Sequence, residues 1–176
     1  MGQDKVDRIK EITKKQFVTY DGEHPYLTEE EADNLCIRKG SLNDKERKII
    51  ENHAAVTLKM LMKLPFPAKL ARVPEYASGH HEKLDGSGYP RGLSEKDLPL
   101  QSRIMVIADI FEALTAKDRP YKDPMKLSQA IKILGFMKKD KHIDADVHDL
   151  FLKNRLFYDY AEKEMAQSQI DEVEIT

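Results

Sequence analysis

Apolar residues recur along most of this chain at the spacing of an α-helix, between charged residues that would face solvent. The most apolar stretch is residues 100–114. Since aromatic residues are few and tryptophan is absent, we expect Leu, Ile, Met and Ala to form the core of an all-α domain. The pattern predicts helices over residues 4–20, 28–37, 44–64, 100–114 and 126–138, and shorter ones starting near Pro74 and around residues 147–151.

Residues typical of helix N-caps predict where two of these helices begin. Thr28 precedes Glu31 by three residues, and Asn43 precedes Glu46 by the same spacing, so each pair forms a capping box. The run Pro65-Phe66-Pro67 ends the helix of residues 44–64, because proline cannot continue the hydrogen-bond ladder. We therefore divide the chain into an N-terminal linker or packing helix (1–22), a main domain (23–165) and a flexible, polar tail (166–176).

The amino-acid composition limits the kinds of partner and compartment that we expect for this chain. The chain carries 29 Lys and Arg against 31 Asp and Glu, a formal net charge of −2, which predicts no general nucleic-acid binding. The single cysteine, Cys36, excludes an internal disulfide and fits a reducing compartment. No apolar run approaches the roughly 20 residues of a membrane span, so we expect no membrane segment and a cytoplasmic protein.

The densest group of chemically active residue types is the stretch 80–90, which reads His-His-Glu-Lys-Leu-Asp-Gly-Ser-Gly-Tyr-Pro. We place its histidines, His80 and His81, on the helix that starts near Pro74. Adjacent helical residues point about 100° apart, so both histidines reach one cation only at a helix end or between helices. The Asp-Gly-x-Gly sequence indicates a turn with glycine at positive φ and close approach of a ligand.

Two more residues extend this group into a predicted metal site. His53 lies on the apolar stripe of the helix 44–64, which we expect to be buried, and Asp109 lies within the most apolar helix. A buried carboxylate is costly unless it is paired or bound to metal. Three imidazoles and a carboxylate suit a divalent transition metal, with Zn, Fe, Mn and Ni all admissible. The alternatives are a core histidine bonded to a carbonyl at His53, and pairing of Asp109 with Arg103 or a neighbouring helix.

Several polar residues near this group have both a functional and an ordinary interpretation. Glu82 and Asp85 are either ligands, partners of ligands, or solvated acids in a turn. Arg103, Arg119 and Lys122 either hold phosphate, arginine through its bidentate fork, or are surface cations. Cys36 has no second cysteine beside it, which favours an inert helix residue over a ligand.

The motif His-His-Glu-x-x-Asp-Gly-x-Gly-Tyr-Pro is followed by a helix reading Arg-Ile-x-x-Ile-Ala-Asp-x-Phe-x-Ala-Leu-Thr and then by Arg-Pro-Tyr. Together, over about residues 40–135, they resemble the HD-GYP family, the branch of HD-superfamily metal phosphohydrolases linked to cyclic-di-GMP hydrolysis. The resemblance implies an HD-domain-like helical bundle that binds two or three metal ions, often iron, with a bridging hydroxide that attacks a phosphodiester. It also implies a cyclic dinucleotide or other phosphate ester as substrate and an upstream sensor or receiver domain, and it leaves a homodimer open.

The resemblance also assigns roles to individual positions. His53, His80, His81 and Asp109 match metal ligands, and the last three of these match the catalytic centre. Arg119, Lys122 and Tyr89 match positions that contact the substrate.

The chain departs from the family pattern upstream of His53. The His-Asp pair that names the family falls about 29 residues earlier, where His24 is followed by Pro25 rather than aspartate. His24 is therefore a further candidate ligand, whereas Thr28 replaces a family lysine and Glu112 a frequent aspartate. Three hypotheses follow: a metal-dependent phosphodiesterase, a catalytically degenerate domain that binds nucleotide, metal or a partner protein, and a truncated output domain with its missing ligands further upstream.

Overall fold

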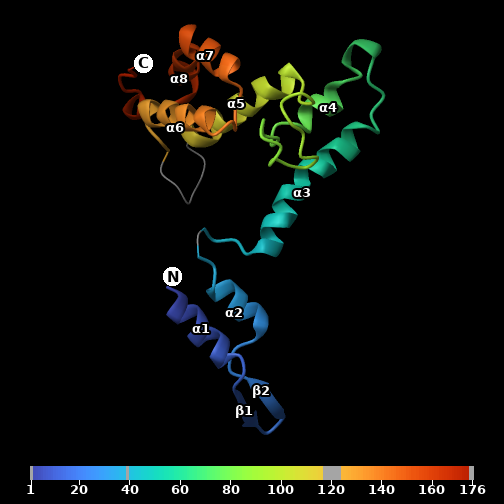
Figure 1. Cartoon of the computed structure of the whole chain (residues 1–176), viewed down its shortest axis with the longest axis vertical. Coiled ribbons are helices and arrows are strands. Elements are labelled where there is room, and N and C mark those ends of the chain that lie inside the picture. Colours follow the sequence, from blue (N-terminus) through green and yellow to red (C-terminus); the bar gives the residue numbers. More distant parts are fainter. Residues whose placement is uncertain (1, 39, 117–123, 175–176) are drawn as a thin grey trace. The chain divides into compact units, whose positions relative to one another are not determined.

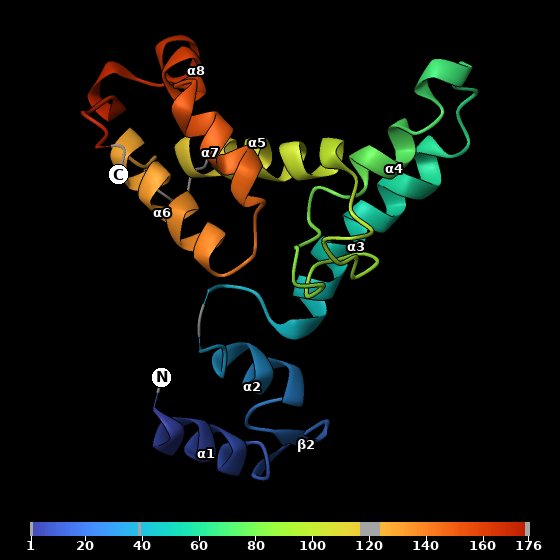
Figure 2. The same cartoon turned by 45° about the horizontal axis from the view of Figure 1, so that its top comes forward.

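A computed structural model of the chain describes residues 2–38, 40–116 and 124–174. The fold is helical, as predicted, with one small two-stranded sheet among the described residues (Figures 1 and 2). The α-helices are α1 (Gln3–Ile12), α2 (Glu29–Leu35), α3 (Asp44–Leu61), α4 (Val73–Ala77), α5 (Leu100–Thr115), α6 (Leu127–Lys139), α7 (Ala145–Lys153) and α8 (Leu156–Glu164). The strands are β1 (Gln16–Thr19) and β2 (Gly22–Pro25), and two short 3₁₀ helices span Ala68–Leu70 and Gln167–Gln169.

The chain divides into two compact units, Met1–Glu51 and Asn52–Thr176, with the boundary inside α3. Our expected boundary lay near residue 22, at the end of a predicted N-terminal helix. Among the described residues, no helix is both long enough and apolar enough to cross a bilayer.

The first unit corrects the helix predicted over residues 4–20. Its helix α1 ends at Ile12, and β1 and β2 then pair as an antiparallel hairpin with Thr19 opposite Gly22. Gly22 has φ +140°, which a tight hairpin turn allows at glycine. The β-forming residues Phe17 and Val18 outweigh the helical spacing there, and the Phe17 ring packs 5.2 Å from that of Tyr26.

Both predicted capping boxes are confirmed. At the start of α2, the Thr28 hydroxyl accepts from the Glu31 amide at 3.2 Å, and Glu31 accepts from the Thr28 amide at 2.9 Å. At the start of α3, the Asn43 side chain and the Glu46 amide lie 2.9 Å apart, with the reciprocal bond also at 2.9 Å. These bonds satisfy amides that have no partner within the helix.

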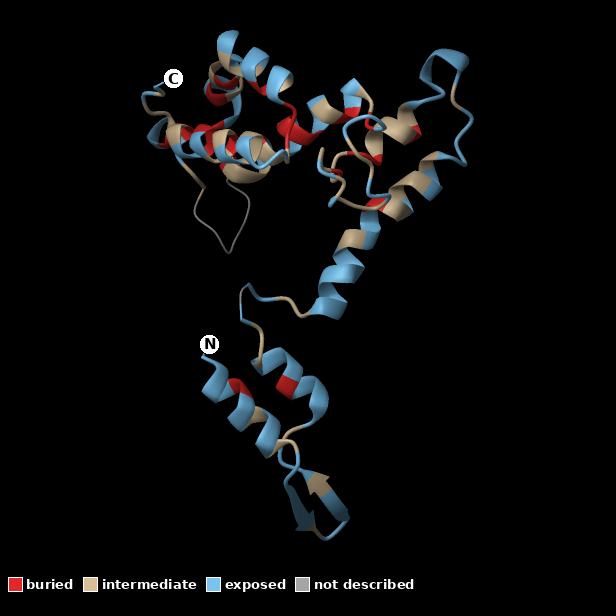
Figure 3. Cartoon of the chain, viewed as in Figure 1, coloured by how far each residue is buried: buried red, intermediate tan, exposed pale blue. Residues whose placement is uncertain are grey.

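The core of the second unit lies where α5, α6, α7 and α8 meet (Figure 3). Helix α5 buries one face, including Val106, Ile107 and Phe111, against the other three helices. The pattern predicted α5 and α6 to within a few residues, but it missed α8. That helix contributes Phe157, a fully buried side chain, to the core.

Helix α3 departs from our prediction of a buried stripe. Ile49 is 74% exposed, Met60 is 65% exposed, and Val56 and Leu64 are also exposed. Among the described elements, none packs extensively along this helix. The stripe was inferred from spacing alone, which shows where an apolar face lies but not what covers it.

Residues 169–173, within the segment that we expected to be a flexible tail, pack against the core of the second unit. Gln169 is 5% exposed, and Ile170 and Val173 pack against the core. The Asp171 carboxylate accepts hydrogen bonds from the amide and the hydroxyl of Ser128, at 2.9 and 2.8 Å, in the first turn of α6. These contacts tie the segment to both α6 and the core.

Arg103, at the start of α5, joins three segments of the second unit. Its Nη1 lies 2.9 Å from the Asp144 carboxylate, its Nε donates to the Leu98 carbonyl at 2.8 Å, and its Nη2 donates to the Glu95 carbonyl. Asp144 in turn caps α7 by accepting from the Val147 amide at 3.0 Å. Burial raises the pKa of Asp144, but the hydrogen bonds from Val147 and Arg103 outweigh it and hold the pKa below its usual range.

We expect Asp144→Asn to lower the free energy of unfolding by about 1–3 kcal/mol at pH 7, because it removes a charge-assisted bond from a buried site. The folded-state pKa is below the unfolded value of 3.8, so this stabilisation is present above pH 3.8 and disappears as the pH falls through the folded pKa. Urea denaturation of the unmodified chain and of the Asp144→Asn variant between pH 7 and pH 3 measures this stabilisation. The exposed neighbour Asp146 is the control, and equal effects of Asp144→Asn and Asp146→Asn would contradict the account.

Candidate metal centre

The paired histidines follow helix α4 rather than lying on it. The helix ends at Ala77 with Ser78 as its C-cap, so His80 and His81 sit in the turn beyond. This corrects our placement of both residues on the helix. It also removes the geometric difficulty of adjacent helical side chains, because the turn lets both rings face the same side.

Three imidazoles converge in the second unit. His53, from α3, places its Nε2 3.0 Å from the Nε2 of His81. The ring centroids of His80 and His81 are 4.1 Å apart, and those of His53 and His80 are 5.8 Å apart. One nitrogen from each ring lies within 4.8 Å of the others. His53 is exposed and the other two are half-buried, so our expectation that His53 lies on a buried helix face is wrong.

A backbone carbonyl orients the His80 ring. The Nδ1 of His80 lies 2.6 Å from the carbonyl oxygen of Ala77, which can only accept a hydrogen bond. In the neutral form of His80, this contact places the proton on Nδ1 and leaves the lone pair on Nε2. Metal-binding histidines are commonly held in this way by a partner on the second nitrogen.

The surroundings of His81 favour its neutral form. Burial, followed by the neighbouring His80 and His53, lowers the pKa of His81 to about 4, although the Asp109 charge acts in the opposite direction. A neutral imidazole is the form that binds a metal, so His81 has its lone pair available at neutral pH. Three nitrogen donors within 4.8 Å of one another fit a divalent ion with metal–nitrogen distances of about 2.0–2.1 Å.

Asp109 is exposed, whereas we predicted a buried carboxylate. It lies on α5 but is exposed, so it does not carry the desolvation cost inferred from its apolar neighbours. Its charge acts on His81, which places it close to the cluster, although it is not part of the three-histidine group. The alternative pairing with Arg103 does not occur, because Arg103 pairs with Asp144.

Glu82, directly after the two histidines, anchors the loop that follows. It is fully buried, and its two carboxylate oxygens accept from the backbone amides of Arg91 and Leu93, both at 2.8 Å. It is thus neither a solvated acid nor part of the histidine group. The sequence held no signal for this role, because its partners are backbone amides that any residue supplies.

The glycines of the motif serve this loop. Gly86 has φ +79°, as the turn prediction required. A Cβ at Gly88 would lie 2.4 Å from the Lys83 amide nitrogen and 2.5 Å from the Glu82 Cα. Gly88 therefore permits close contact between two parts of the loop rather than approach of a ligand. Asp85 accepts from the Ser87 amide at 2.8 Å, which closes the turn.

The loop also brings Tyr89 against the cluster. The Tyr89 ring lies 4.7 Å from the His81 ring at 30°, and the Tyr89 amide donates to the His81 carbonyl at 3.2 Å. The two other predicted substrate contacts, Arg119 and Lys122, lie outside the described residues. Arg103, considered above as a phosphate ligand, has its guanidinium engaged with Asp144 and two carbonyls.

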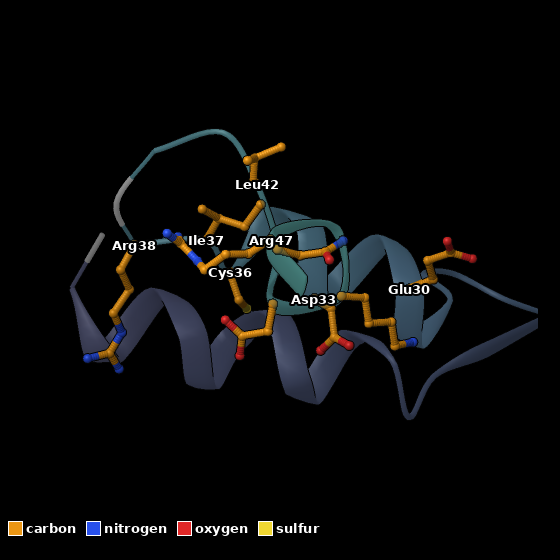
Figure 4. Close-up of a pocket in the computed structure, with 10 residues that line it drawn as sticks. Glu30, Asp33, Cys36, Ile37, Arg38, Leu42 and Arg47 are labelled. Carbon is orange, nitrogen blue, oxygen red and sulfur yellow. The ribbon is translucent and has the colours of Figure 1, made fainter. Parts of the chain in front are cut away.

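His24 belongs to the first unit, in strand β2. Its Nε2 lies 3.3 Å from the Asp21 carboxylate, and its ring lies 5.7 Å from that of Phe17. That unit also holds a cavity of about 600 Å³, with acidic Glu30 and Asp33 and basic Arg38 and Arg47 in its wall (Figure 4). Cys36 lines the same cavity at the end of α2.

We expect Glu82→Gln to lower the free energy of unfolding by about 1–3 kcal/mol, because one carboxylate oxygen is replaced by an NH₂ group that faces a backbone donor. The control is Glu95→Gln, which neutralises an exposed acid of the same loop. Chemical denaturation of both variants measures the difference. If the two variants match in stability, Glu82 does not anchor the loop.

Comparison with known proteins gives one matching family. The HD domain model matches residues 30–147. A probable cyclic di-GMP phosphodiesterase of Vibrio cholerae is 39% identical over 137 residues, which is 74% of this chain and 31% of that protein. A 3'3'-cGAMP-specific phosphodiesterase 1 of the same organism is 37% identical over 126 residues, 72% of this chain and 28% of the relative.

A cyclic di-GMP phosphodiesterase of Thermotoga maritima is 35% identical over 121 residues, covering 69% of this chain and 32% of the relative. The chain thus spans less than a third of the length of these relatives. The family match covers α3 and the paired histidines, which supply the cluster, and also the glycine-rich loop and α5. The chain belongs to the HD domain family, in agreement with its resemblance to the HD-GYP proteins.

Proposed function

We propose that this chain is a metal-dependent phosphodiesterase domain that hydrolyses a cyclic dinucleotide. The observation that carries the proposal is the convergence of His53, His80 and His81, with ligand nitrogens within 4.8 Å of one another. The relatives named as cyclic di-GMP and 3'3'-cGAMP phosphodiesterases support the choice of substrate class. Signalling control then comes from an upstream sensor or receiver domain, as the family resemblance implies.

In this proposal the three histidines hold a divalent ion, which is iron, manganese, zinc or nickel. Such an ion acts as a Lewis acid on a phosphoryl oxygen and makes water a stronger acid. The Ala77 carbonyl holds the His80 ring in orientation, and burial keeps His81 neutral. Asp109 contributes a negative charge beside His81.

The remaining residues bind the substrate. Arg119 and Lys122 neutralise phosphate charge, arginine through its planar fork. Tyr89 presents an aromatic ring next to His81, with the ring position set by the Glu82-anchored loop. Aromatic rings of this kind stack on nucleobases.

We expect the metal-loaded chain to convert cyclic di-GMP or 3'3'-cGAMP to linear products, measured by chromatography. His81→Ala lowers the rate by more than about 100-fold. Loss of a residue that only supports a metal ligand already lowers activity by about 10–100-fold, and loss of a ligand costs more. Asp109→Asn lowers it by about 10–100-fold. The control is His142→Gln, a half-buried histidine outside the cluster, which leaves the rate within about twofold.

Intact dinucleotides after prolonged incubation with the metal-loaded chain would overturn the proposal. Binding of the dinucleotide by calorimetry without turnover would instead identify a signalling module that senses the nucleotide. That second function has one sequence feature in its favour, Pro25 in place of the family aspartate.

A further inference from the structure

A groove on the second unit combines exposed apolar side chains with basic ones nearby. It encloses about 550 Å³ between the C-terminal end of α3, the loop that follows and α4, and its apolar wall includes Leu58, Leu61, Met62, Leu64 and Phe66. Met62 is 70% exposed and Leu64 is 54% exposed, so the described residues of the second unit leave both uncovered. Apolar side chains gathered at an exposed site mark interaction surfaces, and the flexible methionine is common on them.

The stretch of chain that forms most of this groove is basic. Residues 52–74 contain no Asp or Glu. Their Lys and Arg residues, all of them exposed, are Lys59, Lys63, Lys69 and Arg72. Arg91, also exposed, lies in the groove wall, as does Glu75, which pairs with Arg72 at 2.8 Å. We call this surface the basic groove, and it suits a partner that presents apolar side chains together with negative charge.

The first unit carries a surface of the opposite charge. Residues 16–37, which include the hairpin and α2, contain no Lys or Arg. Their acidic residues, all of them exposed, are Asp21, Glu23, Glu29, Glu30, Glu31 and Asp33. The same segment leaves Val18 77% exposed and Tyr26 61% exposed, and most of it is drawn as exposed in Figure 3. We call it the acidic surface, and its exposed tyrosine is of a residue type enriched at protein interfaces.

We propose that the acidic surface of one copy of this chain binds the basic groove of a second copy. Both surfaces expose apolar side chains, and the charges of residues 16–37 are opposite in sign to those of residues 52–74. Opposite charges steer the two surfaces together and disfavour pairing of either surface with itself. Reciprocal exchange of the contact joins two copies into a closed dimer, in which the same pair of surfaces meets twice. This inference does not depend on the proposed function.

A second copy fits the basic groove better than an anionic membrane does. Leu58, Leu61 and Phe66 are half-buried in the wall of a concave groove, whereas a bilayer receives side chains that protrude. The chain also contains no tryptophan, a residue that membrane-surface helices commonly carry on their apolar face. A groove lined by apolar side chains instead receives the apolar face of a protein element.

The test measures the molar mass of the full chain by sedimentation velocity over a range of protein concentrations. The unmodified chain forms a dimer. One variant combines Glu23→Lys with Glu29→Lys on the acidic surface, and another combines Lys63→Glu with Lys69→Glu beside the basic groove. Each raises the Kd of the dimer by at least about tenfold, because like charges then face each other. All four side chains are exposed, and circular dichroism checks that both variants fold.

Mixing the two variants separates a contact between copies from a contact within one chain. In a mixed dimer, one contact joins the two unmodified surfaces and the other joins the two altered ones, so every introduced charge faces an opposite one. The mixture therefore associates at least about fivefold more tightly than either variant alone. Docking within a single chain gains nothing from mixing, so a mixture that associates no better than its components overturns the proposal.

Two further variants test the surfaces without altering the acidic side. Met62→Gln, which removes an exposed apolar side chain from the groove, raises the Kd of the dimer by about tenfold. The control is Leu150→Gln, which makes a similar change at a 57% exposed residue of α7 and leaves the Kd within about twofold.

The control for charge is Lys132→Glu with Lys153→Glu, two exposed residues of α6 and α7. It changes the net charge as much as the groove variant does and leaves the Kd within about threefold. Equal weakening by this control and the groove variant overturns the proposal. So does an unmodified chain that stays monomeric at every concentration, including one that binds phosphatidylserine vesicles instead.

Discussion

The buried carboxylate of Glu82 is the constraint on which the histidine centre depends. A fully buried acid is costly unless its oxygens are satisfied, and here the Arg91 and Leu93 amides satisfy them. This fixes the loop that begins directly after His80 and His81 and returns Tyr89 to the His81 ring. Two proposed metal ligands and one proposed substrate contact therefore share a single internal anchor. The same loop leaves no room for a side chain at Gly88, where a Cβ would lie 2.5 Å from the Glu82 Cα.

Much of the fold followed from local signals. The capping pairs Thr28–Glu31 and Asn43–Glu46 predicted two helix starts, because both partners of a capping box lie within four residues of each other. Helices α5 and α6 followed from their periodicity. Where two local preferences competed, as at Phe17 and Val18, helical spacing gave the wrong element, and a hairpin formed.

The tertiary contacts of the centre were harder to predict. Residue types identified His53, His80 and His81 as a group, and the structure brings them together. Spacing did not reveal that His53 and Asp109 would be exposed, because exposure depends on which elements pack over a helix face. The role of Glu82 was also hidden, since it binds backbone amides, which leave no trace in the sequence.

The most direct test of the account is elemental analysis of metal bound to the purified chain, prepared anaerobically, with and without the change His81→Ala. The account predicts at least one Fe, Mn, Zn or Ni ion per chain, and loss of that ion in the variant, because His81 lies at the centre of the three-histidine group. A chain with no bound metal, or with equal metal content in both proteins, would contradict it.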